Sequence, residues 1–241
     1  MTTAEIDRCV EFIKRCVGDR PIVIGVSGGV DSAVCLNLCT RAVGPNKIIA
    51  VHLPTGITPE VDTRDVYEEC RRIGVVPTTK QISGLTAAFI GKVGRPVDKQ
   101  VIGNLSARVR MVLLYALANK HNGRVCGTGN RTEYFLGYTT KYGDNAADFY
   151  PILHLLKTEV WAMAQELGVV DSIIAKPPSA GLWEGQTDEG EIGMSYYDVD
   201  VGIKSYMGDI AKGTIPSELL KINMANRHKS EPGPSLLQMR W

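Results

Sequence analysis

The feature that most constrains this chain is an apolar run that leads without a break into a glycine turn. Residues 22–26 read IVIGV, residues 27–32 read SGGVDS, and a helix-like pattern continues to about Ala42. Short β-branched runs of this kind are typical of strands buried on both faces of a parallel sheet. Because neighbouring parallel strands need a crossover, usually a helix, this start predicts an α/β fold.

The rest of the chain repeats this alternation. A first helix, capped by Thr2 or Thr3, would share one apolar face among Ile6, Val10, Ile13 and Val17. We predict strands at 22–26, 47–53, 76–82 (the weakest) and 124–127, and further helices at 30–42, 58–73, 104–119 and 157–167. Right-handed crossovers then give a single domain over 1–241, a doubly wound parallel β-sheet flanked by helices on both faces (Rossmann-like).

Two parts of this pattern are less regular. Residues 83–101 mix glycine, proline and charge and predict no single element. Asn104 is the expected cap of the helix that follows. That helix would place Leu113, Ala116 and Leu117 on one face.

Charge and cysteine content argue against several classes of protein. Lys plus Arg number 27 and Asp plus Glu number 26, so there is no basic excess for nucleic-acid binding. No apolar run approaches the roughly 20 residues that span a bilayer, and the first residues lack the order of a secretory signal. The six cysteines contain no Cys-x-x-Cys pair, which argues against a zinc or iron–sulfur site and favours reduced thiols in the cytoplasm.

The SGGVDS hexapeptide predicts an anion site. Its glycines let backbone N–H groups approach phosphate, the following helix N-terminus favours negative charge, and two serine hydroxyls add donors. Asp31 would repel phosphate unless a cation lay between them, and Mg²⁺ would supply that cation. The hexapeptide is neither a Walker A loop nor a Gly-x-Gly-x-x-Gly fingerprint. The alternative is a plain strand-to-helix turn with Asp31 in the first helical turn, where acids are favoured.

The hexapeptide resembles the ATP loop of the PP-loop ATP pyrophosphatases, the adenine nucleotide alpha hydrolase-like superfamily. These enzymes split ATP between the α and β phosphates and leave an adenylylated carbonyl or carboxylate. They include NAD synthetases, GMP synthetases, argininosuccinate synthetases and tRNA-modifying enzymes. The loop therefore indicates the chemistry, and other stretches must indicate the substrate.

Several further stretches resemble the ammonia-dependent NAD synthetase family. They are GNLSARVRM at 103–111, GTGNRTE at 127–133, GYTTKYGD at 137–144, AD at 147–148, Lys157, Pro-Ser at 178–179 and His-Lys at 228–229. The resemblance runs from about Ile22 to about Lys229, and its specificity comes from the order and spacing of the whole set.

The resemblance implies roles for residues in these motifs. The residues implied to bind ATP are Gly25, Val26, Ser27, Gly28, Gly29, Val30, Asp31, Ser32, Thr128, Lys157 and Ser179. Those implied to bind deamido-NAD are Arg108, Tyr138, Lys141, Asp144, Asp148, His228 and Lys229. Asp31 and Glu133 would hold Mg²⁺, and the catalytic residues would be Asp31, Lys157 and Asp144.

The reaction that the resemblance implies has two steps. The nicotinate carboxylate of deamido-NAD attacks the α-phosphorus of ATP, and pyrophosphate leaves. Ammonia then attacks the adenylylated carbonyl and expels AMP, with catalysis by positioning and charge neutralisation. Only 26 residues precede Ser27 and twelve follow Lys229, too few for a glutamine-hydrolysing domain, so we expect free ammonia as the nitrogen source. Family members are homodimers, which implies a homodimer here, with no nucleic-acid or membrane partner.

Other interpretations stay open at this point. Singly, Arg108 and Arg110 read as solvated helix arginines and Glu133 as a first-turn acid. One rival is another PP-loop enzyme, which would usually show cysteine pairs or a basic module. The other is a non-catalytic adenine-nucleotide binder, which would not need Glu133, Lys141 and Asp144 together.

The chain also departs from the family pattern. His52 stands where many members carry an arginine that helps to bind ATP, so a contact with ATP is in question there. Residues 129–131 read GNR, where Asp-His is commoner. Residues 177–191, rich in proline, glycine and acids, are expected to form a mobile lid near the site.

Overall fold

A four-stranded parallel sheet lies at the centre of the computed structural model, which describes residues 3–183, 185–208 and 216–230. The strands are β1 (Ile22–Gly25), β2 (Ile48–His52), β3 (Thr78–Thr79) and β4 (Arg124–Cys126). Their order across the sheet is β3-β2-β1-β4, and every neighbouring pair is parallel. The predicted α/β fold with a parallel sheet is therefore confirmed.

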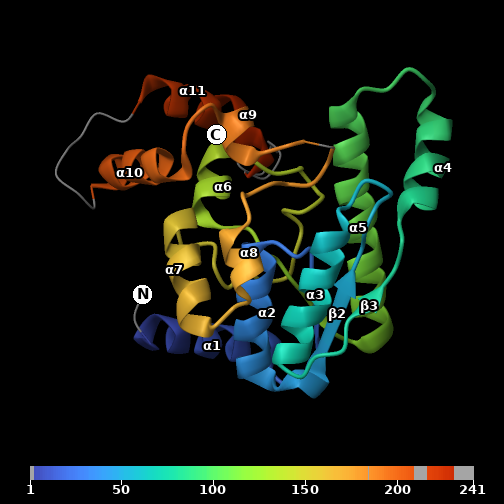
Figure 1. Ribbon diagram of the computed structural model, residues 1–241, viewed down its shortest axis with the longest axis vertical. Coiled ribbons are helices and arrows are strands. Elements are labelled where there is room, and N and C mark those ends of the chain that lie inside the picture. Colours follow the sequence, from blue (N-terminus) through green and yellow to red (C-terminus); the bar gives the residue numbers. More distant parts are fainter. Residues whose placement is uncertain (1–2, 184, 209–215, 231–241) are drawn as a thin grey trace, which may run out of the picture.

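Helices cover both faces of this sheet (Figure 1). The helices on one face are α1 (Thr3–Val17), α2 (Val30–Val43), α3 (Glu60–Arg72), α7 (Lys157–Leu167) and α8 (Asp171–Ala175). The other face is covered by α5 (Lys99–His121), against which α4 (Ser83–Val93) packs. The side chains of β1 alternate between the two cores, Ile22 and Ile24 facing α2 and Val23 facing α5.

The crossovers explain where a ligand site should form. The chain steps from β1 to β2 and on to β3 in one direction, so α2 and α3 lie on the same face. It then returns through α4 and α5 to β4, on the other side of β1. The loops that leave β1 and β4 therefore diverge at the carboxyl edge of the sheet, and ligands of open α/β sheets bind at such a switch point.

A further layer lies beyond this carboxyl edge (Figure 1). It consists of α6 (Arg131–Leu136), α9 (Asp188–Ile192), α10 (Tyr196–Met207) and α11 (Ser217–Asn226). Its apolar cluster is formed by Leu136, Leu156, Val199, Ile203 and Leu219. Single 3-10 turns, Pro45–Lys47 and Arg227–Lys229, precede β2 and follow α11.

Several predicted boundaries are wrong. The third strand, predicted over 76–82, shortens to Thr78–Thr79 because it is the exposed edge of the sheet, where Val76 is 87% exposed. The helix predicted from 58 begins at Glu60, directly after Pro59. The irregular segment 83–101 is mostly helical, and the predicted cap Thr2 lies outside the described residues.

The long helix α5 begins at Lys99, earlier than predicted. Its N-cap is Asp98, whose carboxylate accepts a hydrogen bond from the Val101 amide (2.7 Å). Asn104, the predicted cap, lies inside the helix, where its amide oxygen accepts from the Thr140 hydroxyl (2.7 Å). That contact joins α5 to the GYTTKYGD segment instead of beginning the helix.

Among the described residues, α5 is the one helix long and apolar enough by composition to cross a membrane. One such helix is weak evidence, because core helices pass the same test. Leu113 and Leu117 pack in the core between α5 and the sheet as predicted, whereas Ala116 is exposed. Packing on the sheet accounts for the apolar character of α5.

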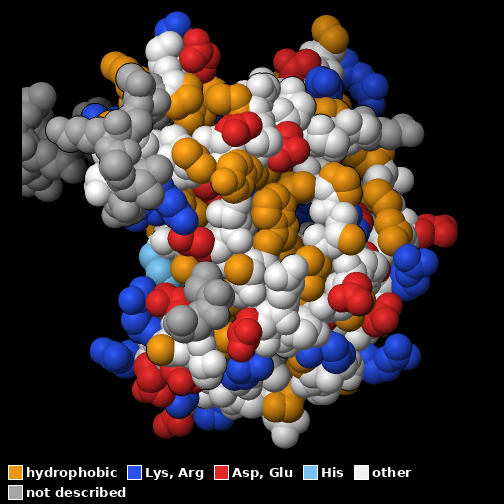
Figure 2. All heavy atoms as spheres, turned by 60° about the vertical axis from the view of Figure 1, so that its left-hand side comes forward, with side chains coloured by type: hydrophobic (Ala, Val, Ile, Leu, Met, Phe, Trp, Pro, Cys, Tyr) orange, Lys and Arg blue, Asp and Glu red, His pale blue; other side chains and the backbone are white. Residues whose placement is uncertain are grey.

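Charges of both signs are interspersed over the face shown in Figure 2, while apolar side chains gather across its upper middle. Neither sign dominates that face, in keeping with a formal net charge of +1.

Candidate active site

The SGGVDS loop lies between β1 and the N-terminus of α2 and is shaped by its own hydroxyls. The Ser32 hydroxyl donates to the Gly29 carbonyl (2.9 Å) and accepts from the Ser27 amide (3.2 Å). Gly28 has φ +83°, and a Cβ there would lie 2.6 Å from the carbonyl oxygen of Asp62. Only glycine fits both the conformation and the space. The SGGVDS segment thus forms a defined turn at the switch point, and its binding of an anion stays a prediction.

A lysine that the sequence did not single out also supports this loop. Lys176 Nζ donates to the Gly28 carbonyl (3.0 Å) and pairs with Asp62 and Asp65 (2.6 Å each). Asp65 is fully buried, so its ion pair with Lys176 is shielded from solvent. Lys176 stands alone before two prolines in the sequence, and no local pattern indicates that it reaches the loop.

The charged centre of the site is Lys157, at the start of α7. Its Nζ lies 2.5 Å from Asp31 Oδ2 and 3.6 Å from Glu133 Oε1. The other Asp31 oxygen accepts from the Asn130 side-chain amide (2.8 Å). Asp31 thus meets Lys157, which lies 126 positions away in sequence, and Asn130, which lies 99 positions away. The structure brings together three of the predicted site residues, Asp31, Glu133 and Lys157.

The one positive charge of Lys157 does not cancel the two negative charges of Asp31 and Glu133. Burial opposes the charge on Lys157, but Asp31 and Glu133 outweigh it and raise its pKa. Burial, followed by the nearby charge of Asp31, raises the pKa of Glu133 to about 8. A single ammonium group thus compensates two carboxylates, and a further cation would relieve the repulsion between these carboxylates.

Local structure fixes the positions of Glu133 and Lys157. Asn130 and Glu133 form a capping box: the Asn130 side chain accepts from the Glu133 amide (2.9 Å), and Glu133 accepts from the Asn130 amide (3.2 Å). The Thr132 hydroxyl accepts from the Lys157 amide (3.0 Å) and donates to buried Asp200 (2.5 Å). The GNR segment that departs from the family pattern therefore supplies the cap that orients Glu133.

A third carboxylate near Lys157 belongs to Asp188, which the sequence pattern places only within the predicted lid. Asp188 is 4% exposed and begins α9. One of its oxygens accepts from the Tyr196 hydroxyl (2.9 Å) and the other from the Ala180 amide (2.9 Å). The Tyr196 ring lies 5.2 Å from Lys157 Nζ. Burial raises the pKa of Asp188, and Lys157 opposes that rise. Asp188 thus joins the segment before α9 to the charged centre.

A second group of predicted residues gathers around the GYTTKYGD segment. Lys141 Nζ donates to the His228 carbonyl (2.6 Å), and Arg108 Nε donates to the Lys141 carbonyl (3.2 Å). Lys229 Nζ donates to the Gly137 carbonyl (3.0 Å), and burial lowers its pKa. These contacts bring α5, the segment after α6 and the turn after α11 into one cluster.

Asp144 and Tyr138 flank this cluster. Asp144 accepts from the Thr139 hydroxyl (2.7 Å) and the Thr140 amide (2.8 Å). The Tyr138 hydroxyl donates to Glu191 (2.5 Å) on α9. Tyr138 therefore links this cluster to the helix that carries Asp188.

Three further predicted site residues are Asp148, Ser179 and Thr128. Asp148 accepts from the Val125 amide (2.7 Å) and so joins its segment to β4. Ser179 is exposed, and its hydroxyl accepts from the Gly181 amide (3.1 Å). Thr128 is half-buried in the loop after β4. The structure does not bring the Ser179 hydroxyl to the charged centre.

His52 is buried, at 2% exposure. Its Nδ1 donates to the Val26 carbonyl (2.9 Å), so Nε2 of the neutral ring accepts from the Thr63 hydroxyl (3.0 Å). Burial lowers its pKa, which favours this neutral form. Arg110, which alone would read as solvated, donates to the Leu53 carbonyl (3.0 Å), and burial lowers its pKa. A neutral, fixed imidazole therefore stands at the usual arginine position.

A phosphate-type loop with two acids and a buried lysine, at the switch point of a parallel sheet, defines an α/β enzyme of the PP-loop type. Comparison with known proteins then gives the family. The chain belongs to the NAD synthase family, whose model matches residues 5–234.

Its relatives cover nearly the whole chain. It is 46% identical to the NH3-dependent NAD synthetase of Methanoregula boonei, over 90% of this chain and 89% of that protein. Among solved structures, NMN synthetase from Francisella tularensis has a TM-score of 0.88 at 31% identity, covering 96% of this chain and 97% of the other. The NH3-dependent NAD synthetase of Campylobacter jejuni has a TM-score of 0.80 at 28% identity, covering 98% and 99%.

Proposed function

We propose that this chain is an ammonia-dependent NAD synthetase that converts deamido-NAD to NAD with ATP. Membership of the NAD synthase family makes it an ATP-dependent ligase. The observation that carries the proposal is Lys157 Nζ beside Asp31 (2.5 Å) and Glu133 (3.6 Å), next to the SGGVDS loop. One buried cation and two acids meet there at the end of an anion-binding loop.

The loop binds the pyrophosphate portion of ATP in this proposal. The backbone amides of Gly28 and Gly29 and the hydroxyls of Ser27 and Ser32 are the donors, and Lys176 keeps the loop in shape through the Gly28 carbonyl. The other nucleotide contacts are proposed for Gly25, Val26, Val30, Thr128 and Ser179.

Asp31 and Glu133 are the residues that would hold Mg²⁺. They fit this ion, because both offer carboxylate oxygens and because their mutual repulsion calls for a further cation. When bound, Mg²⁺ neutralises phosphate charge and the charge that develops as pyrophosphate leaves. Lys157 remains charged between the two acids and contributes a second fixed positive charge at the same place.

The residues around GYTTKYGD bind the deamido-NAD and orient its nicotinate carboxylate. Arg108, Lys141 and Lys229 supply positive charge and donors, and Asp144 holds the turn in which they meet. We assign the remaining contacts to Tyr138, Asp148 and His228. The carboxylate oxygen attacks the α-phosphorus of ATP, and the bond to pyrophosphate breaks.

Ammonia then attacks the carbonyl carbon of the adenylylated nicotinate, and AMP leaves with the oxygen of the old carboxylate. A carboxylate is a poor acyl donor because oxide is a poor leaving group, and adenylylation removes that obstacle. No nucleophilic side chain is required. The positioning of both substrates and the neutralisation of charge by Lys157 carry the catalysis.

We also propose the assembly and the location of the enzyme. Exposed apolar side chains gather on α4 and α5, where Phe89 is 53% and Val112 58% exposed. We propose that a second copy of the chain covers them in a homodimer. The reduced, scattered cysteines and the nucleotide substrates fit a cytoplasmic enzyme. We propose that residues 177–191 act as a lid over the site, and that the hydrogen bonds of Asp188 hold it there.

Deamido-NMN is a second candidate substrate. The Francisella tularensis neighbour is an NMN synthetase, so deamido-NMN, which lacks the adenylyl half, is the alternative acceptor. The proposal favours the dinucleotide because the curated relatives are NAD synthetases.

Pyrophosphate release tests the proposal. The purified chain, with ATP, Mg²⁺ and ammonium, is assayed with deamido-NAD, with deamido-NMN and without an acceptor. We expect the highest kcat/KM with deamido-NAD and no release without an acceptor. Higher kcat/KM with deamido-NMN would favour the second candidate, release that ignores both acceptors would indicate another PP-loop enzyme, and no turnover at all would indicate a nucleotide binder.

A further inference from the structure

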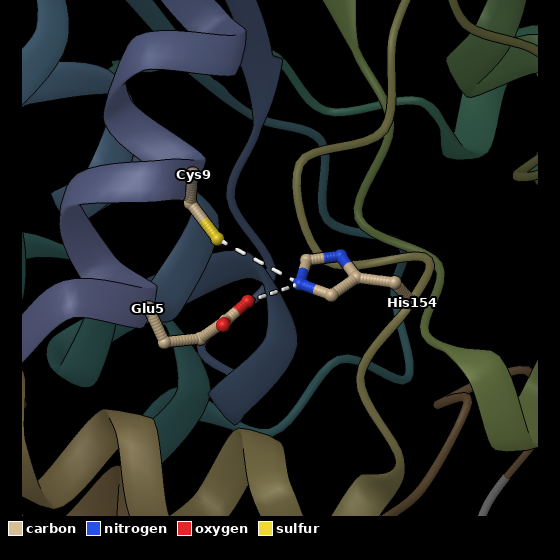
Figure 3. A group of neighbouring side chains, drawn as sticks. All are labelled: Glu5, Cys9 and His154. Atoms are coloured by element: carbon tan, nitrogen blue, oxygen red, sulfur yellow. Dashed lines mark hydrogen bonds and ion pairs between the residues drawn. The ribbon is translucent and has the colours of Figure 1, made fainter. Parts of the chain in front are cut away.

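Three side chains outside the candidate active site converge on one point (Figure 3). Glu5 and Cys9 lie one turn apart on α1, and His154 lies in the turn that precedes α7. Glu5 Oε1 lies 2.7 Å and Cys9 Sγ 4.0 Å from the same atom, Nε2 of His154. The three donor atoms all lie within 4.8 Å of one another.

This arrangement does not fit a nucleophilic triad. In a triad the carboxylate and the nucleophile contact different ring nitrogens, so that the base can pass a proton between them. Here both contacts end on Nε2. Burial, and after it Glu5, raises the pKa of the Cys9 thiol to about 11, so the free thiol is a weak nucleophile at neutral pH.

We propose that Glu5, Cys9 and His154 form a binding site for a zinc-like transition-metal cation, separate from the Asp31–Glu133 pair. Thiolate and imidazole are ligands for Zn²⁺ and its neighbours rather than for Mg²⁺. Such a site has three protein ligands and leaves a fourth position for water. The His154 side chain is 38% exposed, which gives the cation a route from solvent.

A tetrahedral site requires the three donor atoms, which now lie within 4.8 Å of one another, to reach separations of roughly 3.3 to 3.5 Å. Zinc bonds of about 2.3 Å to sulfur and about 2.0 Å to nitrogen in a tetrahedron separate the two ligands by roughly 3.5 Å. The Cys9–His154 separation is 4.0 Å. Glu5 Oε1, now 2.7 Å from Nε2, would move away by about half an ångström to make room for the bonds. Its side chain is 19% exposed.

Binding exchanges a proton for the cation. The Cys9 thiol proton leaves as the metal binds, and the ring proton that Nε2 of His154 shares with Glu5 moves to Nδ1, so that the neutral imidazole binds through Nε2. Arg8, 2.9 Å from the same Glu5 oxygen, opposes the added charge, but its side chain is 68% exposed and free to turn outward. The bound cation would join α1 to the turn before Lys157, whose Leu155 carbonyl already accepts from the Arg131 amide of α6 (2.7 Å).

Metal titration of the untagged full chain, without ATP, tests this site. We expect one equivalent of Co²⁺ to give a thiolate-to-cobalt charge-transfer band in the near ultraviolet, and Zn²⁺ to displace it. Cys9→Ser should abolish the band. His154→Ala should weaken Zn²⁺ binding at least about 100-fold, because even partners of ligands contribute about 10- to 100-fold. Zn²⁺ should also raise the Tm of the natural chain and leave that of the variants unchanged.

Two controls separate this site from other metal binding. Cys16→Ser removes an exposed thiol from the same helix and should leave the band intact. Asp31→Asn removes a proposed Mg²⁺ ligand and should leave it intact as well. Because Cys9 lies in the core, the partly exposed His154 provides a second, milder variant. Absence of the band in the natural chain, its survival in Cys9→Ser, or unchanged Zn²⁺ affinity in His154→Ala would overturn the proposal.

Discussion

At the residue scale, the candidate site depends on one buried cation. Lys157 is 2% exposed, and a buried ammonium group is costly unless acids accompany it. Asp31 and Glu133 provide that compensation, yet Glu133 remains under-compensated, with its pKa raised to about 8. A surplus of negative charge at the end of an anion loop is poor for stability and well suited to receive a metal–nucleotide complex.

We expect Asp31→Asn to lower kcat for Mg²⁺-dependent pyrophosphate release at least about 100-fold, because one preorganised charge is typically worth that much or more. The fold should survive, since the amide oxygen can still accept the hydrogen bond from Lys157, and circular dichroism will check it. Asp19→Asn, at a fully exposed acid, is the matched control and should leave kcat unchanged. Near-normal turnover of the Asp31 variant would contradict the assignment.

His52 makes a prediction about pH. Its folded pKa lies below the ordinary 6.5 because of burial, so the unfolded chain takes up a proton more readily. The stability present above pH 6.5 is therefore lost as pH falls through the lower folded pKa, by up to about 1.4 kcal/mol per pH unit for this one group. His52→Asn, which keeps the bond to Val26, should flatten the pH dependence of the free energy of unfolding between pH 6.5 and 5. The exposed His121→Asn should not, and equal slopes in all three proteins would count against this account.

At the element scale, α9 is the helix that connects the proposed lid to the charged centre. Asp188 accepts hydrogen bonds from Ala180 in the lid and from Tyr196 on α10, and the Gln186 side chain donates to Glu191 (3.0 Å). The Leu182 amide donates to Gln186 (2.7 Å). These bonds tie the residues before α9 to this short helix, so we propose that the position of the lid and the charge of the site are coupled through Asp188.

We expect Asp188→Ala to raise KM for ATP roughly 10- to 100-fold, the range given by hydrogen bonds to charged groups. Limited proteolysis within 177–187 should become faster. Tyr196→Phe, which loses one of the two bonds, should shift both readouts in the same direction by less. Glu166→Ala, on the exposed face of α7, is the control. Proteolysis rates identical to those of the natural chain would show that Asp188 does not hold the segment.

At the scale of the whole molecule, the two groups of proposed site residues meet at α6 and at the glycine that follows it. The Glu133 side is reached by the loops after β1 and β4, and the Gly137 side by the turn after α11. The family relatives match this chain over most of its length and carry NH3-dependent names. Two predictions concern the enzyme as a whole.

The first concerns the nitrogen source. NH3, not NH4⁺, has the free electron pair that attacks the adenylylated carbonyl. At fixed total ammonium, the initial rate of NAD formation should therefore rise as pH raises the NH3 fraction, within the range where the protein stays folded. Ammonia-free glutamine should give almost no NAD. Equal rates with both nitrogen sources, in protein shown by mass spectrometry to be free of a glutaminase, would refute this.

The second concerns assembly. If a second copy covers the apolar surface of α4 and α5, then Phe89→Glu and Val112→Glu should convert a dimer to a monomer in analytical ultracentrifugation, because each would bury an unpaired charge. Val76→Glu, at an even more exposed apolar residue shortly before the edge strand β3, should not. A natural chain that sediments as a monomer at micromolar concentration would rule out this interface.

The sequence by itself determined the α/β class, the anion loop and the family, because strand runs, glycine turns and ordered motifs are local patterns. It also identified Asp31, Glu133 and Lys157 through a resemblance. It missed the start of α5 at Lys99, after the cap Asp98, because an irregular Gly- and Pro-containing segment hides that helix. It gave no sign that Lys176 supports the loop.

Only the tertiary structure decided which side chains meet. Lys157 reaches Asp31 across 126 positions, and His154 reaches Glu5 across 149. Asp188 and His52 owe their shifted pKa values first to burial, which no single segment specifies. The physical reason is that periodicity and turn chemistry act over a few residues, whereas charge balance and ligand sets depend on how elements pack in space.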